Sequence, residues 1–325
     1  MNFIKNTIVI ILFSGFLLSK PIIIKLATLA PEGTEYYNLL LEMGQRWQEE
    51  TNGEVILRIY PNGVVGRESD TIRKMRIGQI QASAMSSIGL SDLTDQIQAF
   101  TIPMGFKDYD DVEKVKDVMF DDISDGLSDS GFKLLFLVDI GWVYWFSADK
   151  VSVPEDLRSA KIYTTAGDYV TVELFKEFGF NAIPVSETDI LTSLQTGMIN
   201  TVQTVPILSL SSGWFALMPN MLDLKWAVFI GAVIVDDRVW SKIKPKHQKV
   251  MMEIAHEIGE KYKESGRKTE AQAIETMKDY GMKITTPTTE ELEVWEDFKE
   301  EIMPDVINTY VPQEIYEKVT SALDE

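Results

Sequence analysis

Aromatic side chains are the most concentrated chemical feature of this sequence. Trp142, Tyr144, Trp145 and Phe146 stand close together, and Tyr163 follows in a short β-branched segment. Rings of this kind stack on apolar or aromatic ligands, and a tyrosine hydroxyl adds a hydrogen-bonding group. Because residues 142–146 alternate as a strand does, about half of these rings should face a core. The pattern is therefore compatible with a binding surface and with core packing.

Groups that commonly perform catalysis or bind metals are scarce. The 325-residue chain has no cysteine and two histidines, His247 and His256. Nine residues apart on a helix, the two rings would point to opposite sides, so they cannot share a metal ion, and we expect both at the surface. No phosphate-binding glycine loop, nucleophile elbow or zinc-protease motif occurs. We predict no catalytic residue, no metal site and no cofactor.

Composition and charge narrow the classes further. The 31 Lys and Arg against 50 Asp and Glu give a net charge of -19, and 45% of the residues are hydrophobic. Such a surface repels phosphate backbones, so we expect no nucleic-acid partner. The composition is typical of a globular protein, and the length suits two domains with full cores.

The N-terminus has the pattern of a targeting signal. Lys5 precedes an apolar run over residues 7–18 that is short for a membrane span, and Ser19 is the best last residue before cleavage. We predict a signal peptide over residues 1–19 and a periplasmic or otherwise exported protein. An N-terminal anchor and a core strand are the alternatives.

The body of the chain predicts two similar α/β lobes. Strands over 22–28, 54–60 and 80–85 alternate with a helix over 35–50 and a second helix that ends at Gly78. The same order recurs with strands over 161–165, 181–185 and 198–205 and helices over 168–178 and 187–196. Residues 69–81 align without gaps with residues 188–200, and Asp70 and Asp189 stand at expected N-cap positions. This order implies parallel strands in each lobe.

Three further segments link the lobes. We expect strands over 132–138 and over the wholly apolar 227–235, which is long enough to cross between both sheets. A helical pattern from 245 to 280, with a possible bend at Gly266, would brace both lobes. The predicted fold is α/β, a two-lobed periplasmic binding protein fold with parallel-type mixed sheets, crossing strands and a long bracing C-terminal helix. Lobe I would comprise residues 20–145 and about 232–272, and lobe II residues 146–231 and about 273–325, with a ligand cleft at the carboxyl ends of the strands.

Four segments carry a resemblance to a known family: residues 34–53, 56–66, 153–162 and 194–200. Together they resemble the solute-binding proteins of tripartite ATP-independent periplasmic (TRAP) transporters, over about residues 22–312. The resemblance implies a receptor that closes on a small solute, commonly an organic acid, and delivers it to membrane permease subunits.

The sequence departs from this family where the ligand carboxylate is usually bound. The resemblance places Tyr163 where the family usually has an arginine, and no second arginine occurs in residues 141–146. A guanidinium holds a carboxylate by two charge-assisted hydrogen bonds, and tyrosine cannot. We therefore expect a divergent member with a small, apolar or aromatic-compatible ligand. Arg67 or Lys225 is the candidate for a replacement cation.

The candidate ligand-binding residues combine the aromatic groups with polar residues near the expected strand ends. They are Tyr163, Thr165, Trp142, Tyr144, Trp145, Tyr36, Ser86, Ser87, Gln203, Trp214 and Trp226.

Three functional hypotheses follow, and a receptor of a TRAP-type importer leads. The same receptor could instead take an amphipathic monocarboxylate. The second hypothesis is an exported lipid or hydrophobe carrier that passes its cargo to a tetratricopeptide-repeat partner. The third is an enzyme that uses Tyr163 or the pair Asp168 and Glu173 for proton transfer; we rank it last because no positioned nucleophile, metal or histidine supports it.

Overall fold

The computed structural model describes residues 20–324. The predicted signal peptide, residues 1–19, lies outside the described residues. Within the described range, no helix is both long and apolar enough to cross a membrane.

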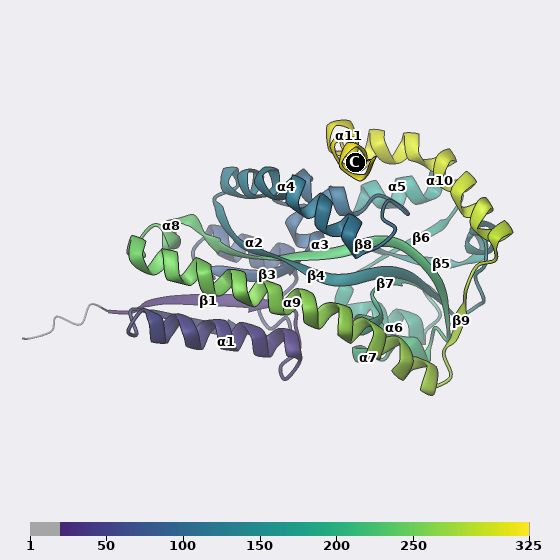
Figure 1. The fold of residues 1–325 in the computed structure, drawn as a ribbon. Helices are drawn as coiled ribbons and strands as arrows, with labels where there is room; N and C mark the ends of the chain where they lie inside the picture. Colours follow the sequence, from purple (N-terminus) through teal and green to yellow (C-terminus); the bar gives the residue numbers. More distant parts are fainter. Residues whose placement is uncertain (1–19, 325) are drawn as a thin grey trace, which may run out of the picture.

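One mixed sheet organises the described chain (Figure 1). Its strand order is β2-β1-β3-β8-β4-β7-β5-β6, with β9 paired to β8. The strands are β1 (Ile22–Thr28), β2 (Val55–Tyr60), β3 (Ala82–Ser86), β4 (Phe132–Ser147), β5 (Lys161–Thr165), β6 (Asn181–Val185), β7 (Thr201–Thr204), β8 (Asn220–Asp236) and β9 (Lys283–Thr285).

Helices surround this sheet. They are α1 (Glu35–Glu50), α2 (Glu68–Arg76), α3 (Ser87–Leu90), α4 (Tyr109–Asp129), α5 (Tyr169–Glu177), α6 (Ile190–Gln195), α7 (Pro206–Ser211), α8 (Asp237–Trp240), α9 (Pro245–Asp279), α10 (Thr289–Thr309) and α11 (Gln313–Asp324). Short 3-10 helices are η1 (Asp95–Phe100), η2 (Pro154–Ser159), η3 (Glu187–Asp189) and η4 (Trp214–Ala216).

The predicted α/β architecture is confirmed. β1 pairs in parallel with β2 and β3, and β5 pairs in parallel with β6 and β7. Between these parallel groups, β8 and β4 run antiparallel to each other, β8 runs antiparallel to β3, and β4 runs antiparallel to β7. The short β9 pairs in parallel with β8. The sheet is therefore mixed, and the long strands β4 and β8 belong to both of its halves. We call the part that carries β1, β2 and β3 the first half and the part that carries β5, β6 and β7 the second half.

Local details correct the sequence analysis at three places. The predicted strand 132–138 and the aromatic run 142–146 form one strand, β4. Asp70 is not the N-cap of α2; Arg67 is, and Asp70 accepts a hydrogen bond from the Arg67 backbone N–H instead. His247 is buried rather than exposed, because α9 packs its ring toward Glu54, the residue that precedes β2. The distance between His247 Nε2 and a Glu54 carboxylate oxygen is 3.5 Å.

Helix α9 is the predicted brace. It contacts β4 and α1 at one end and α7 of the second half at the other, and it runs beside the long strands in Figure 1. Gly266 does not interrupt it. The glycine instead permits close approach, since a Cβ at this position would lie 2.6 Å from the carbonyl oxygen of Asp139 in β4.

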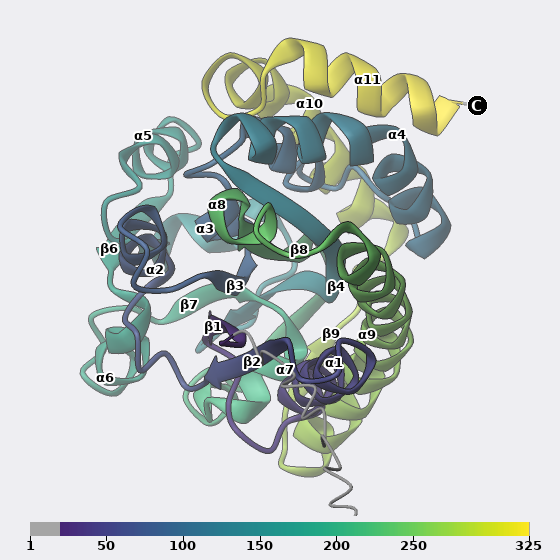
Figure 2. The same cartoon turned by 90° about the vertical axis from the view of Figure 1, so that its left-hand side faces the viewer.

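The C-terminal helices return over the sheet to α4. Phe298 of α10 packs on Phe178 and Phe180, which follow α5, while α11 packs on α4 and η1. Figure 2 shows α10 and α11 beside α4. The division into lobe I and lobe II at the predicted boundaries stays a prediction, and α11 would connect the two.

We predict that Gly266→Ala destabilises the protein although alanine favours helices by about 1 kcal/mol. The new methyl group must displace the β4 backbone or α9, which should lower the free energy of unfolding by about 1–3 kcal/mol. Chemical denaturation measures this loss. Gln272→Ala, at an exposed position of α9, is the control and should change stability little. An unchanged or increased stability of Gly266→Ala would contradict the close approach.

Candidate functional site

The register of β3 on β8 shows that the parallel strands of the first half have their carboxyl ends toward the middle of the sheet. Ala82 of β3 pairs with Val235 of β8, and Ser86 at the end of β3 pairs with Gly231. β3 thus runs along β8 toward the other half. Since β1 and β2 run parallel to β3, the carboxyl ends of all three strands share this direction.

The parallel strands of the second half run in the opposite direction, so their carboxyl ends also lie toward the middle of the sheet. Thr201 of β7 pairs with Ser147 of β4, and Thr204 at the end of β7 pairs with Tyr144. The carboxyl ends of β5, β6 and β7 therefore face those of β1, β2 and β3 across the middle of β4 and β8. Loops at the carboxyl ends of parallel strands are where α/β proteins bind ligands. This junction is the candidate site.

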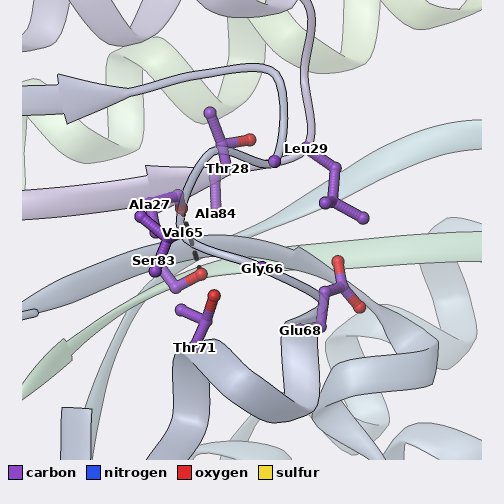
Figure 3. A pocket seen from close by; sticks show the side chains of 10 residues that line it. Ala27, Thr28, Leu29, Val65, Gly66, Glu68, Thr71, Ser83 and Ala84 are labelled. Atoms are coloured by element: carbon purple, nitrogen blue, oxygen red, sulfur yellow. Dashed lines mark hydrogen bonds between the residues drawn. The ribbon is translucent and has the colours of Figure 1, made fainter. Parts of the chain in front are cut away.

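Glu68 organises the wall formed by the first half. Its carboxylate accepts hydrogen bonds from the Ser86 backbone N–H at 2.7 Å, the Ser86 hydroxyl at 2.8 Å and the Gly89 N–H at 2.9 Å. The start of α2 is thereby tied to the end of β3. Figure 3 shows Glu68 at a small pocket lined by Ala27, Thr28, Leu29, Gly63, Val65, Gly66, Glu68, Thr71, Ser83 and Ala84.

Tyr163 and Glu187 belong to the wall formed by the second half. The Tyr163 hydroxyl lies 3.2 Å from Thr165 Oγ1 at the end of β5. Asp168 follows as the N-cap of α5 and accepts a hydrogen bond from the Thr171 N–H at 3.0 Å. Glu187 begins η3 directly beyond β6, and its Oε2 is buried without a hydrogen-bond partner among the described residues.

Electrostatic interactions connect the two walls. Burial raises the pKa of Glu68 to about 7 against the three hydrogen bonds that lower it, and the negative charge of Glu187 adds to the increase. Burial also raises the pKa of Tyr163, with further contributions from Glu187 and Asp168. Glu187 therefore lies close enough to act on groups of both walls. The junction is acidic.

Sequence reasoning missed both glutamates, although the internal repeat contains a signal for them. The gapless alignment of residues 69–81 with 188–200 extends one residue toward the N-terminus, where Glu68 corresponds to Glu187. Each begins the helical segment that follows the second strand of its half. Equivalent positions in two facing halves can bring like side chains to one cleft.

Trp142 and Tyr144 point to helices rather than to an open surface. The Tyr144 hydroxyl donates to Glu270 Oε1 of α9 at 3.0 Å, and the Trp142 ring lies beside Tyr109 of α4, with 5.2 Å between centroids. Both residues are at most 5% exposed. The Trp142 Nε1 is buried without a hydrogen-bond partner among the described residues. A ligand role for Trp142 and Tyr144 stays a prediction.

Trp145 and Trp226 lie in the core of the second half. Their rings meet edge to face at 5.4 Å, and they are 0% and 5% exposed. The neighbouring rings Phe175, Phe180 and Trp295 complete this aromatic cluster. Both rings pack as core residues do, and the Trp145 Nε1 is buried without a hydrogen-bond partner among the described residues. Their role in ligand binding stays a prediction.

The remaining candidates occupy varied places. Tyr36 is half-buried beside Tyr262 of α9, with its hydroxyl 3.5 Å from the Ile140 carbonyl oxygen of β4. Ser87 begins α3 and is 7% exposed. Gln203 lies on β7, and its amide nitrogen is buried without a partner among the described residues. Trp214 is half-buried in η4 against the core of the second half.

Of the two predicted replacement cations, Arg67 lies beside the site. It precedes Glu68, and its Nε is 3.5 Å from an Asp70 carboxylate oxygen. The Lys225 ammonium instead donates to the Lys107 carbonyl oxygen at 2.7 Å and lies 4.7 Å from the Trp142 ring centroid. Lys225 is therefore engaged near α4.

Two α/β halves joined by crossing strands, with their loop-bearing edges facing each other, define a two-lobed binding protein. The DctP family model, described as bacterial extracellular solute-binding protein, family 7, matches residues 26–309. The chain belongs to this family of TRAP solute-binding proteins, which is a family of transport receptors and not of enzymes. Its members are extracytoplasmic, as predicted for this chain.

Individual relatives are distant but cover most of the chain. The 2,3-diketo-L-gulonate-binding periplasmic protein YiaO of Escherichia coli K12 is 26% identical, over 74% of this chain and 73% of its own. The C4-dicarboxylate-binding periplasmic protein DctP of Rhodobacter capsulatus is 24% identical, over 86% and 85%.

Solved structures of TRAP periplasmic solute-binding proteins share the fold. One from Xanthobacter autotrophicus with bound β-D-galacturonate has a TM-score of 0.83 and 19% identity, covering 92% of this chain and 98% of its own. One from Sulfurospirillum deleyianum with bound succinate has a TM-score of 0.84 and 20% identity, covering 94% and 100%.

The acidity of the site predicts a pH dependence that Glu68→Gln should remove. Because the pKa of Glu68 is higher in the folded protein (about 7) than its ordinary 4.5, folding favours the protonated acid. The contribution of Glu68 to stability is therefore greatest below pH 4.5 and falls as the pH rises toward 7, by about 1.4 kcal/mol per unit of pKa difference. Glutamine mimics the neutral acid and lacks this titration.

Denaturation of wild type and Glu68→Gln between pH 4.5 and 8 measures the effect as a difference between the two proteins. The exposed Glu32→Gln serves as the control and should run parallel to wild type. A constant difference between wild type and Glu68→Gln across this range would show that Glu68 is not shifted upward.

Proposed function

We propose that this receptor closes on a small solute that it recognises by apolar and aromatic contacts and neutral hydrogen bonds, without an arginine–carboxylate pair. The observation that carries the proposal is the surroundings of Tyr163. Its hydroxyl lies 3.2 Å from Thr165 Oγ1, and the negative charges of Glu187 and Asp168 add to the burial that raises its pKa. A ligand carboxylate placed there would meet negative charge rather than a guanidinium.

Electrostatics favour this choice over a simple transfer from the relatives. The printed names of the relatives and solved structures include C4-dicarboxylates, succinate and sugar acids. Burying a carboxylate without a cation costs several kcal/mol, and the negative charges of Glu187 and Asp168 add repulsion. A ligand group that donates hydrogen bonds would instead match the unpartnered oxygen of Glu187.

Exposed apolar side chains in the loops and helix starts around the candidate site support an apolar ligand surface. They are Leu29 after β1, Val64 after β2, Ile88 after β3, and Tyr169 and Val170 after β5. Each lies beyond the carboxyl end of a parallel strand, the end that faces the junction. A ligand burying about 300 Å² of apolar area would gain up to ~7 kcal/mol before ordering costs.

An amphipathic monocarboxylate is the alternative ligand within the same function. Arg67 favours it, because this guanidinium is 40% exposed at its side chain and flanks Glu68. To bind a carboxylate, Arg67 would exchange its contact with Asp70 for the ligand.

Delivery of the solute follows from the family. TRAP solute-binding proteins work with membrane permease subunits. The hypothesis of a carrier with a tetratricopeptide-repeat partner stays a prediction, which the neighbouring genes would test.

Substitutions of Tyr163 test the ligand class. Mass spectrometry first identifies the solute that co-purifies. Tyr163→Ala should weaken its binding by roughly 2–4 kcal/mol through loss of ring contacts, and Tyr163→Arg should confer measurable binding of succinate or D-glucuronate, which wild type should lack. Calorimetric titration measures both. Tight succinate binding by wild type would instead favour Arg67 as the replacement cation. Loss of that binding in Arg67→Ala would confirm this role.

Closure is a separate prediction. A solute that contacts both walls should favour the closed arrangement, so the radius of gyration should decrease when the identified solute is added. Small-angle scattering with and without solute measures the change, with a non-binding solute as the control. An unchanged radius at saturation would count against a hinged receptor.

A further inference from the structure

The middle of β4 and β8 is the least regular part of the connection between the two halves. The ladder pairs Val143 with Ala227 and then Trp145 with Leu222. It thus advances by two residues on β4 and five on β8, which leaves residues 223–226 of β8 in a bulge. A second shift lies between Asp139 and Gly141 of β4. Bulges bend strands and disrupt the ladder, so this stretch is where relative motion of the halves is most easily absorbed.

Glu270 of α9 holds this stretch on its β4 side. Its carboxylate accepts hydrogen bonds from the Tyr144 hydroxyl at 3.0 Å, the Trp142 backbone N–H at 3.4 Å and the Tyr109 hydroxyl of α4. Glu270 is 8% exposed. The ladder shifts between Val143 and Trp145. Trp142 precedes this step and Tyr144 lies within it, so one carboxylate contacts the strand at both places.

The partners of Glu270 are themselves fixed. Arg267, one turn earlier on α9, contacts Glu113 of α4 at 2.8 Å and lies 4.3 Å from the Tyr109 ring centroid. Gly141 of β4, with φ +142°, allows the strand to approach Glu270 closely, since a Cβ at this position would be 3.3 Å from Glu270 Oε2. Arg267 thus links α9 to α4 beside the Tyr109–Glu270 contact, and the bonds of Glu270 to β4 are the ones that a change of strand bend would alter.

We propose that Glu270 is a positioning residue for closure: its hydrogen bonds to β4 set the bend of the crossing strands and thereby the balance between open and closed arrangements of the ligand site. It touches no ligand in this scheme. The inference rests on the proposed two-lobed receptor function, and it assigns the control of closure to a buried carboxylate behind the site. Loss of the Tyr144 bond releases the half that carries β7, β5 and β6.

The test uses the full chain and needs no ligand. Because the protein has no cysteine, one label can be placed on each half, at Ile77→Cys and Met198→Cys, which are 69% and 54% exposed. Electron spin resonance then gives the distribution of distances between them. Glu270→Ala should shift or widen this distribution, and Glu270→Gln, which retains one accepting oxygen, should lie between it and wild type. Glu264→Ala, exposed on the same helix, is the matched control and should match wild type.

Tyr144→Phe keeps the test decisive if Glu270→Ala fails to fold, because it deletes a single hydroxyl. It should shift the distribution in the same direction while the melting temperature stays near that of wild type. A distribution equal to that of wild type in folded Glu270→Ala and in Tyr144→Phe would overturn the proposal and leave Glu270 a structural residue. This outcome is distinct from failure of the receptor function, which solute binding and scattering of wild type decide.

Discussion

The pairing of β4 with β8 is the constraint on which the rest of the fold depends. Phe132 to Ser147 runs antiparallel to Asn220 to Asp236, and every parallel strand joins the sheet through one of these two. β3 attaches at one end of the ladder and β7 at the other, so the two halves are offset along it. This offset, rather than any contact between the halves, makes the carboxyl ends of the parallel strands face each other.

A long ladder shared by two halves has to be rigid and still allow motion, and its irregular middle serves that need. Away from the middle, buried apolar side chains such as Val233 and Ile234 pack in two separate apolar cores, and the core that contains Ile234 extends over both halves. At the middle, where the pairing is irregular, Trp142 and Tyr144 also donate hydrogen bonds to the Glu270 carboxylate. Polar contacts are directional, so they specify one bend, and each is weak enough to exchange. Packing alone would specify the bend less sharply.

The internal repeat has an electrostatic consequence. Glu68 and Glu187 begin equivalent segments, and facing halves bring equivalent positions to one cleft. Two such acids attract a cationic or hydrogen-bond-donating group of a ligand that lies between them. They repel a ligand carboxylate. In the proposed function, the charges of Glu68 and Glu187 therefore bear on the choice of solute together with the absence of an arginine at position 163.

Local periodicity in the sequence determined the elements and their order, and hence the two similar α/β halves and the long α9, because β-branched strands, glycine stops and helical spacing act over a few residues. The roles of the aromatic residues were decided only by tertiary structure. The alternation along the strand predicts that Trp142 and Tyr144 lie on one face of β4 and Trp145 on the other. It does not predict that Tyr144 contacts α9, that Trp142 contacts α4, or that Trp145 packs against Phe180. The same holds for Glu270 of α9, whose hydrogen-bond partners come from two other elements, α4 and β4. Which face of a strand is covered depends on helices distant in the chain, and no local pattern contains that information.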